Sequence, residues 1–577
     1  MRRLTLMAPV VLATLAVAAP PAWIARSNQN SQYVLDAYAR FGPEQAGSLG
    51  QDGFDYKVID LSPGSEQKEV DAYTAVLAEL NRRLAAETDP FVRQDLEITI
   101  RDVHDQIRGI ELRRKYHLPY INVAQLVFGG LHTLLDDRVA ESRRPAAVTR
   151  LRRYAGLEAG YTPITVQVEQ RTRASLNTPG LLGPARLAVE KDLGNSTYFM
   201  DGLGPLFAKY KLTGYEEPLA ALKKQIAEYN DFIRAEVLSH ARTDFRLPPE
   251  EYAYRLQSLG VDISPEELAA RAHGAFDEIQ GEMTMVAARV AKERGFPSPE
   301  YRDVIRELKK DQLTGSQIMD HYHQRLAQIE EIVRRENLLT LPDRPARMRL
   351  ASAAESAQQP APHMSPPRLL GNTGESGEFV LPLSNPAAKG ERTDDFTFAA
   401  ASWTLTSHEA RPGHELQFAR MIESGVSTAR AVFAFNSTNV EGWGLYSEWM
   451  MFPYMPADGQ LISLQHRLMR AARAFLDPEL QAGKITPEAA KRVLMEDIGL
   501  SDPLATEEID RYTIRAPGQA TSYYYGFTKL LELRQDTEKA LGPKFSAHDF
   551  HDFILTQGLL PPSLLRSAVM DHFAAVK

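Results

Sequence analysis

Two histidines and a glutamate lie within a single seven-residue stretch of this sequence. They are His408, Glu409 and His414. Imidazole nitrogens bind zinc well, and a carboxylate beside them can take a proton from a metal-bound water. These residue types in this arrangement therefore point to metal-dependent hydrolysis.

The spacing of the two histidines differs from the common H-E-x-x-H pattern, in which they lie one turn apart on the same helical face. Here Pro412 occupies that position, and His414 comes six residues after His408. On an undistorted helix, residues six apart point about 120° away from each other. Either the histidines do not share a metal, or Pro412 and Gly413 distort the helix and bring His414 back. Both residue types suit such a distortion, because proline removes a helical hydrogen bond and glycine admits unusual dihedral angles.

Three strings resemble, in the same order, the motifs of the bacterial DUF885 family, a group of predicted zinc metallopeptidases. They are H-E-A-R-P-G-H-E-L-Q from His408, E-G-W-G-L-Y-S-E from Glu441, and P-G-Q-A-T-S-Y-Y-Y-G from Pro517. The resemblance spans about residue 50 to the end of the chain, although only the C-terminal half carries specific motifs. It implies that His408 and His414 bind one Zn²⁺ ion and that Glu409 is the general base.

A catalytic zinc typically has three protein ligands and a water, so a third ligand is required. Glu441 is the leading candidate, because the distance from His414 leaves room for one helix to end and another to begin. Gluzincin peptidases place a glutamate ligand on such a following helix. Glu448 shares the helical face of Glu441 within about 20°, and is either the alternative ligand or a partner that holds a histidine tautomer. Trp443 and Trp449 make the segment too apolar for an exposed helix.

The third motif supplies groups for the reacting carbonyl. Peptide hydrolysis builds negative charge on that oxygen, and a phenol or guanidinium aimed at it is stabilising. The resemblance identifies Tyr523 as the tyrosine in this role, and Arg511 or Arg515 could instead clamp a substrate carboxylate. A core position suits Tyr523 equally well, and it is the preferred interpretation of Tyr524 and Tyr525.

The other histidines are expected to lie outside the metal site. Residues two apart on a helix point in different directions, which argues against a metal shared by His321 and His323. We expect surface or capping roles for His548 and His551. No converging partners are evident in the sequence for His104, His117 and His363.

Helical periodicity dominates from about Ser65 onward and predicts a mainly α-helical protein. Apolar stripes run through residues 70–84, 219–237 and 319–333, and Ser264 begins a capping box with proline at the first helical position. The stripes are interpreted as core faces. The resemblance implies a large helical, gluzincin- or neurolysin-like architecture with a deep channel and a small β element near the site.

A change of composition divides the chain. Residues 352–377 are rich in Ser, Ala, Pro and Gly and predict a long loop between an N-terminal helical region, 26–351, and a motif-bearing region, 378–577. Glu378 to Leu383 reads as a strand. It is either an edge strand that binds an extended substrate or part of a small structural hairpin.

Composition excludes several classes of protein. The chain has 577 residues, 44% of them hydrophobic, a formal net charge of −9 and no cysteine. The negative charge and the lack of a long basic run argue against nucleic-acid binding. Without cysteine, there are no disulfides, no thiol nucleophile and no Cys-ligated zinc. Any transition-metal site must use histidine and carboxylates.

The N-terminus predicts a secretory signal peptide over residues 1–25. Arg2 and Arg3 precede an apolar run from Leu4 to Ala19, with candidate cleavage sites after Ala18, Ala19 or Ala25. The run is short for a membrane-spanning helix, which needs about 20 residues, although an uncleaved anchor remains the alternative. We expect a periplasmic or secreted protein with no stable membrane insertion after cleavage.

The sequence therefore predicts an exported zinc metallopeptidase that acts on peptides rather than folded proteins. Two alternatives remain: an amidase or esterase acting on a small molecule at the same metal, and a non-catalytic helical protein that binds peptides. Manganese or cobalt could replace zinc, because sites with two histidines and a glutamate accept several metals. The sequence indicates neither the peptide length nor the oligomeric state.

Overall fold

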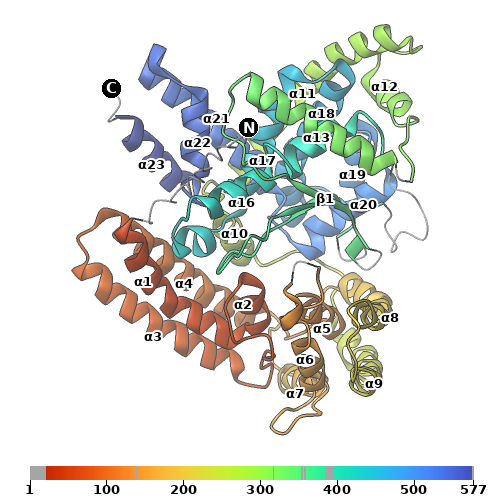
Figure 1. The fold of residues 1–577 in the computed structure, drawn as a ribbon. Coiled ribbons are helices and arrows are strands. Elements are labelled where there is room, and N and C mark those ends of the chain that lie inside the picture. Colours follow the sequence, from red (N-terminus) through yellow and green to blue (C-terminus); the bar gives the residue numbers. More distant parts are fainter. Residues whose placement is uncertain are drawn as a thin grey trace, which may run out of the picture.

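The computed structural model describes residues 21–137, 139–315, 317–352, 355–356, 359–383 and 394–574. Helices dominate it, as the periodicity predicts. Two groups of helices lie along one side of the molecule (Figure 1). The first contains α1 (Ala22–Phe41), α2 (Pro43–Leu49), α3 (Ser65–Ala86) and α4 (Pro90–Tyr116). The second contains α5 (Val123–His132), α6 (Ala146–Tyr154), α7 (Ile164–Ser175), α8 (Arg186–Lys209) and α9 (Glu216–Phe232).

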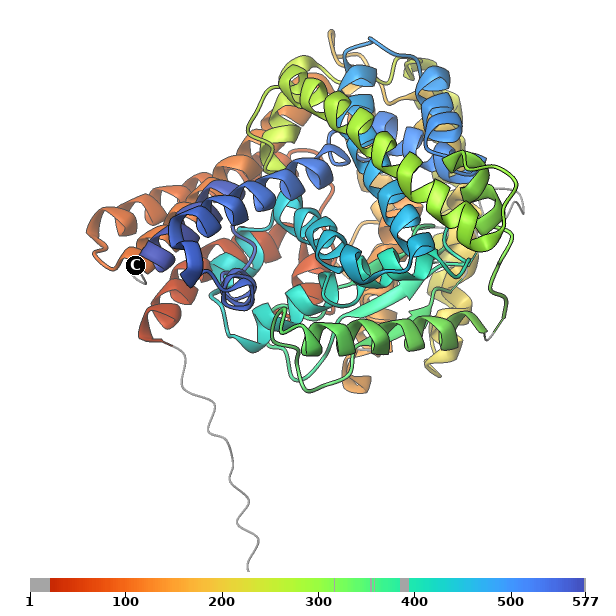
Figure 2. The same cartoon turned by 90° about the horizontal axis from the view of Figure 1, so that it is seen from above.

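The remaining helices form the larger part of the molecule (Figures 1 and 2). The first of these are α10 (Pro249–Ser258), α11 (Pro265–Arg294), α12 (Tyr301–Leu308) and α13 (Gln317–Arg335). The motif region contains α15 (Ala401–Glu409), α16 (His414–Glu423), α17 (Ser437–Met451), α18 (Ala457–Gln481), α19 (Pro487–Arg492), α20 (Asp502–Asp510), α21 (Thr521–Leu541), α22 (Ala547–Leu555) and α23 (Pro562–Ala574).

The predicted apolar stripes face the core. Leu219, Leu222 and Ile226 are buried along α9, and Tyr322 and Val333 are buried along α13. The serine cap of the predicted capping box is also present, because the side chain of Ser264 accepts a hydrogen bond from the backbone N–H of Glu267 at the start of α11. These helices therefore pack through the apolar faces that the periodicity predicts.

Three apolar clusters make up most of the core. One is confined to residues 61–237, chiefly helices α5 to α9. A second joins α10 to α13 with α15 and α18 to α21. The third joins α1, α3 and α4 with α17 and α21 to α23. The two ends of the chain thus share a core, and residue 351 does not mark a boundary between cores.

The β element is a three-stranded sheet in the order β1-β3-β2. Strand β1 (Arg347–Leu350) is parallel to β3 (Glu378–Leu381), and β2 (His363–Ser365) is antiparallel to it. Of the two alternatives for the strand at 378–383, the edge strand is wrong, because β3 is central and all four of its residues are buried. Strand β2, one of the two neighbours of β3, comes from the predicted loop at residues 352–377. Strand β1, the other neighbour, contacts α13.

The first described helix bears on the predicted signal peptide, whose residues 1–20 lie outside the described part of the chain. Helix α1 begins at Ala22, Ile24 is buried, and the ring of Trp23 stacks on Phe91 with centroids 5.2 Å apart. Cleavage after Ala25 would cut the first turn of this packed helix. Within the part of the chain that the structure describes, every helix is too short or too polar to span a bilayer.

Candidate metal centre

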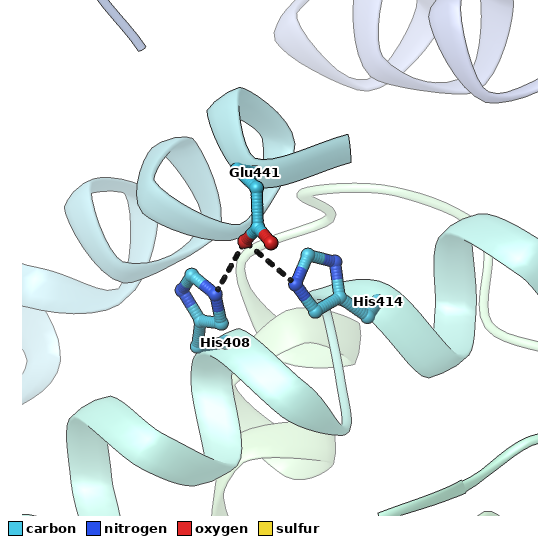
Figure 3. Close-up of side chains that lie close together, drawn as sticks. All are labelled: His408, His414 and Glu441. Carbon is cyan, nitrogen blue, oxygen red and sulfur yellow. Dashed lines mark ion pairs between the residues drawn. The ribbon is translucent and has the colours of Figure 1, made fainter. Parts of the chain in front are cut away.

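His408, His414 and Glu441 come together from three different helices (Figure 3). His408 lies in the last turn of α15, His414 begins α16, and Glu441 descends between them from α17. Each histidine Nε2 lies 3.4 Å from Oε2 of Glu441. For zinc–ligand bonds of about 2.1 Å in tetrahedral geometry, ligand atoms lie roughly 3.4 Å apart. Both the donor set and its spacing fit a zinc ion.

A complete break between α15 and α16 brings the two histidines together. The chain leaves helical geometry at Ala410 (ψ −105°) and regains it after Gly413 (ψ −134°), with a cis peptide bond between Arg411 and Pro412. The imidazole centroids are then 4.6 Å apart. Gly413 is required by a close approach, since a Cβ there would lie 1.9 Å from the carbonyl oxygen of His408.

Arg411 bonds the linker between α15 and α16 to neighbouring segments of the protein. Its guanidinium is buried and donates hydrogen bonds to Glu330 (2.6 Å), Glu415 (2.7 Å) and the carbonyl oxygen of Arg344 (2.8 Å). Glu330 lies on α13, so the pairing ties the linker to a helix far away in the sequence. The positions of both histidines therefore depend on a buried ionic cluster.

We expect Arg411→Met to lower the free energy of unfolding by about 3 kcal/mol, the lower end of the range for a broken buried pair, because Glu330 and Glu415 would keep only their partly exposed partners, Arg334 and Arg344. Arg334 offers a matched control. It pairs with the same Glu330 (3.0 Å), but its side chain is 59% exposed, and its replacement by Met should cost no more than about 1 kcal/mol. Urea unfolding of both variants measures the difference. Equal losses would contradict a stabilising role for the buried cluster.

Glu448 holds the opposite side of the His408 ring. Its Oε1 lies 2.7 Å from Nδ1 of His408, and its Oε2 accepts a hydrogen bond from Thr404 (2.5 Å). An Nδ1–H that donates to this carboxylate leaves Nε2 free to face Glu441. Glu448 is thus the hydrogen-bond partner of His408, and Glu441 is the carboxylate that lies between the two imidazoles. Burial alone would raise the pKa of Glu448, but Arg470 and His408 lower it to about 2.

The electrostatic environment favours a cation. Burial disfavours a charged imidazole, but Glu409, Glu441 and Glu448 outweigh it and raise the pKa of His408 to about 9. Burial opposes ionisation of Glu441 too, yet the two histidines hold its pKa far below the usual range. An excess of carboxylate charge around two imidazoles is an arrangement that a bound metal ion would neutralise.

Three glycines allow the helices around the site to approach closely. A Cβ on Gly444 would lie 2.5 Å from Cε1 of the His408 ring, so the ring occupies the space above this residue. A Cβ on Gly442 would lie 2.6 Å from the carbonyl carbon of Gly526, where α17 packs on α21. Trp443, which lies between Gly442 and Gly444 in the sequence, donates a hydrogen bond to the carbonyl oxygen of Pro412 (3.0 Å). The sequence analysis missed these roles, although glycine inside an apolar helix was an available signal.

Tyr523 lies beside the triad. Its ring is nearly parallel to that of His408, with centroids 6.3 Å apart. Arg511 donates to the Tyr523 oxygen (2.8 Å) and also bonds Gln519. Burial raises the pKa of Tyr523, so the phenol stays protonated at neutral pH. Arg515 is different, since it is 45% exposed and pairs with Glu507.

The neighbouring tyrosines are largely structural, as expected. Tyr525 is buried in the core and donates to Asp262. Tyr524 lies partly buried, with its hydroxyl 3.4 Å from the carbonyl oxygen of Arg271. Neither makes a described contact with His408, His414 or Glu441.

A cavity of about 350 Å³ opens onto His408 and Glu409. Its wall also contains Tyr523, Arg511 and a row of residues on α18, and residues 359–362 border it. A larger cavity, of about 720 Å³, lies between α4, α10 and residues 431–436, and none of the three candidate ligands lines it. Residues 366 and 369, beyond β2, border this second cavity. The smaller cavity is the one that contacts the reactive groups.

Four of the histidines considered in the sequence analysis lie outside the triad and have partners of their own. The prediction for His551 is wrong: it is fully buried, because α22 packs against α16 and α23, and its ring contacts Tyr446 OH (2.9 Å) and the carbonyl oxygen of Leu338 (2.8 Å). His117 does have a partner, Glu251, at 2.5 Å. His321 contacts Ser402 (3.0 Å) and His548 contacts Thr340 (3.2 Å).

Comparisons with known proteins identify relatives without a known activity. The family model described as a bacterial protein of unknown function, DUF885, matches residues 43–569. None of the curated proteins matches the chain significantly. A candidate lipoprotein of unknown function from Shewanella oneidensis has a similar structure (TM-score 0.72, 19% identity, 94% of this chain and 99% of that one). A candidate lipoprotein from Colwellia psychrerythraea is also similar (TM-score 0.76, 18% identity, 96% and 100%). These likenesses show a shared fold.

Proposed function

This chain belongs to the DUF885 family of bacterial proteins of unknown function, and from that premise and the site geometry we propose that it is an exported zinc-dependent hydrolase of peptide bonds. The observation that carries the proposal is the convergence of His408, His414 and Glu441 at ligand spacing, with Glu409 next to them on a cavity. Two imidazoles, one carboxylate and a free carboxylate form the minimal set for hydrolysis by a metal and a general base.

Each residue has a role in this proposal. His408, His414 and Glu441 hold the zinc, which supplies Lewis acidity when bound. Glu409 takes a proton from the attacking water and passes it to the leaving amine. Because Arg511 donates to the Tyr523 oxygen, the hydroxyl hydrogen of Tyr523 can donate to the substrate carbonyl. Arg511 acts through Tyr523 as a positioning residue.

The proposal extends to architecture and location. A gluzincin-like channel is part of the proposal; its support is that one cavity borders residues 359–362, before β2, and another borders residues 366 and 369, after it. Export is supported by the apolar N-terminal run and by the two similar structures, both of candidate lipoproteins. This chain has no cysteine to carry a lipid, so a soluble exported form is proposed.

Metal content provides the test. We expect about one zinc ion per chain in the purified protein and almost none in His414→Ala, because two ligands alone hold zinc poorly. In this variant the zinc content, measured by mass spectrometry, and the rate of hydrolysis of a peptide mixture should fall together. His117→Ala, at a histidine paired with Glu251 away from the site, should keep its zinc. Absence of zinc in the wild-type protein, even after reconstitution, would contradict the proposal and favour a non-catalytic binding protein.

A further inference from the structure

One face of α18 forms a wall of the cavity that contains His408 and Glu409. His466, Met469, Arg470 and Arg473 follow one another at helical spacing and all line it. The two arginines lie deep in the protein, 5% and 6% exposed. Buried guanidinium groups need partners, because an unsatisfied buried donor costs free energy.

The other two guanidinium groups deep in this wall have well-defined partners within the protein. Arg473 donates two hydrogen bonds to the carboxylate of Glu508 (2.7 and 2.6 Å). Arg511 donates to Gln519 and to the Tyr523 oxygen. Both groups are therefore occupied by structural partners.

Arg470 differs from them. Its one ionic partner is Glu448, where Nη2 and Oε1 are 3.4 Å apart, longer than a good charged hydrogen bond. Its Nε and Nη1 are buried with no hydrogen-bond partner among the described residues, and the same holds for Nδ1 of His466 one turn earlier. Arg470 and His466, which line the same cavity, thus keep side-chain nitrogen atoms that form no hydrogen bond within the described part of the protein.

The balance of charged side chains around Arg470 indicates what kind of group its unpaired nitrogen atoms would bind. Among the described residues that line the cavity, four are arginines (Arg470, Arg473, Arg511, Arg515) and three are glutamates (Glu409, Glu507, Glu508). Glu448, which contacts Arg470 from behind this lining, is shared with His408. One positive charge is left without a full counter-charge. Guanidinium groups bind carboxylates through paired hydrogen bonds. An anionic group of the substrate would supply both the charge and the missing acceptors.

We propose that Arg470, assisted by His466, anchors a carboxylate of the peptide substrate beside the metal centre. The carboxylate is either the C-terminus of the peptide or an acidic side chain. This inference rests on the proposed function for the identity of the ligand as a peptide. It makes Arg470 a specificity-determining residue: substrates with the carboxylate bind well, and otherwise identical substrates without it bind weakly.

The test measures binding rather than turnover. Calorimetry with the zinc-loaded Glu409→Gln protein would compare three probes: an alanine pentapeptide with a free carboxyl terminus, its C-terminal amide, and the amide with one alanine replaced by glutamate. A charged hydrogen-bonding partner changes affinity by about 10- to 100-fold. We expect at least one carboxylate-bearing probe to bind tighter than the plain amide by this factor. The free acid identifies a C-terminal carboxylate, and the glutamate peptide an acidic side chain.

Introducing Arg470→Gln into that protein should reduce the preference to less than about threefold. Arg470→Lys keeps the charge and should keep part of the preference, which guards against misfolding of the glutamine variant. Arg467→Gln is the matched control: it lies on the same helix, next to Phe452 and Phe527 and not on the cavity, and should leave the preference unchanged. A general disturbance of Glu448 and His408 would instead weaken all three probes equally and lower the zinc content.

Equal binding of all three probes, or a preference that survives Arg470→Gln, would overturn the inference. Failure of every probe to bind would do the same. These outcomes are distinct from failure of the proposed function. If the protein prefers carboxylate probes but never hydrolyses a peptide, the carboxylate subsite stands and the hydrolase assignment is wrong. If it hydrolyses peptides without this preference, the hydrolase assignment stands and the subsite is wrong.

Discussion

Glu409→Gln should lower kcat/KM for peptide hydrolysis by about 10²- to 10⁴-fold, the range that loss of a general base produces. Zinc content and stability should stay close to those of the wild-type protein. Glutamine has nearly the same shape as glutamate but cannot accept a proton at neutral pH. Oε1 of Glu409 lies 4.0 Å from Nε2 of His408, close enough to reach a water at the metal position yet outside the ligand set.

The measurement is single-substrate kinetics on zinc-loaded protein, with metal content determined on the same sample. Glu423→Gln provides the control, because Glu423 is 41% exposed on α16 and pairs with Arg344; it should retain full activity. Near-wild-type turnover of Glu409→Gln would rule out the assigned base.

Gly444→Ala should weaken zinc binding by about 100-fold or more, above the upper end of what losing a ligand's hydrogen-bond partner costs. The added Cβ would lie 2.5–2.8 Å from three atoms of the His408 ring, closer than atoms can pack. The ring must therefore move, which takes Nε2 away from Glu441 and Nδ1 away from Glu448. A single methyl group, on a residue that binds nothing, would disable the site.

Competition with a chelating dye would measure the zinc affinity. Gly274→Ala is the control: this glycine lies inside α11 with no atom within 4 Å of its added Cβ, so alanine should leave zinc binding intact and slightly raise stability. Wild-type affinity in Gly444→Ala would show that the His408 ring can shift without loss of the ligand set.

The sequence was enough to select three residues that converge in the structure, His408, His414 and Glu441, but not to describe the break between the two histidines. Pro412 and Gly413 indicated a distortion by their types alone. Whether the result is a bend or two separate helices depends on contacts that are distant in sequence, such as Arg411 with Glu330 and Trp443 with the carbonyl oxygen of Pro412. Local propensity contains no information about such partners.

Features that depend on long-range packing were predicted least well. Strand β2 has three residues within a Pro- and Ser-rich segment, too short for a period-two pattern, and exists because it pairs with β3. His551 was expected to have a surface or capping role, yet it lies fully buried on α22 next to Tyr446. Helical stripes, in contrast, were predicted correctly, since amphipathic periodicity is a local property.

The contact between Gly442 and Gly526 has a mechanical consequence. Where α17 and α21 meet backbone to backbone, neither helix can slide or tilt without the other. Glu441 precedes the first glycine directly, and Tyr523 lies one turn before the second. Glu441 and Tyr523 therefore lie on two helices that move together, and Glu448 and Trp443 on α17 bond the same unit to His408 and Pro412. A change in the distance between Glu441 and Tyr523 would therefore require α17 and α21 to separate at the two glycines.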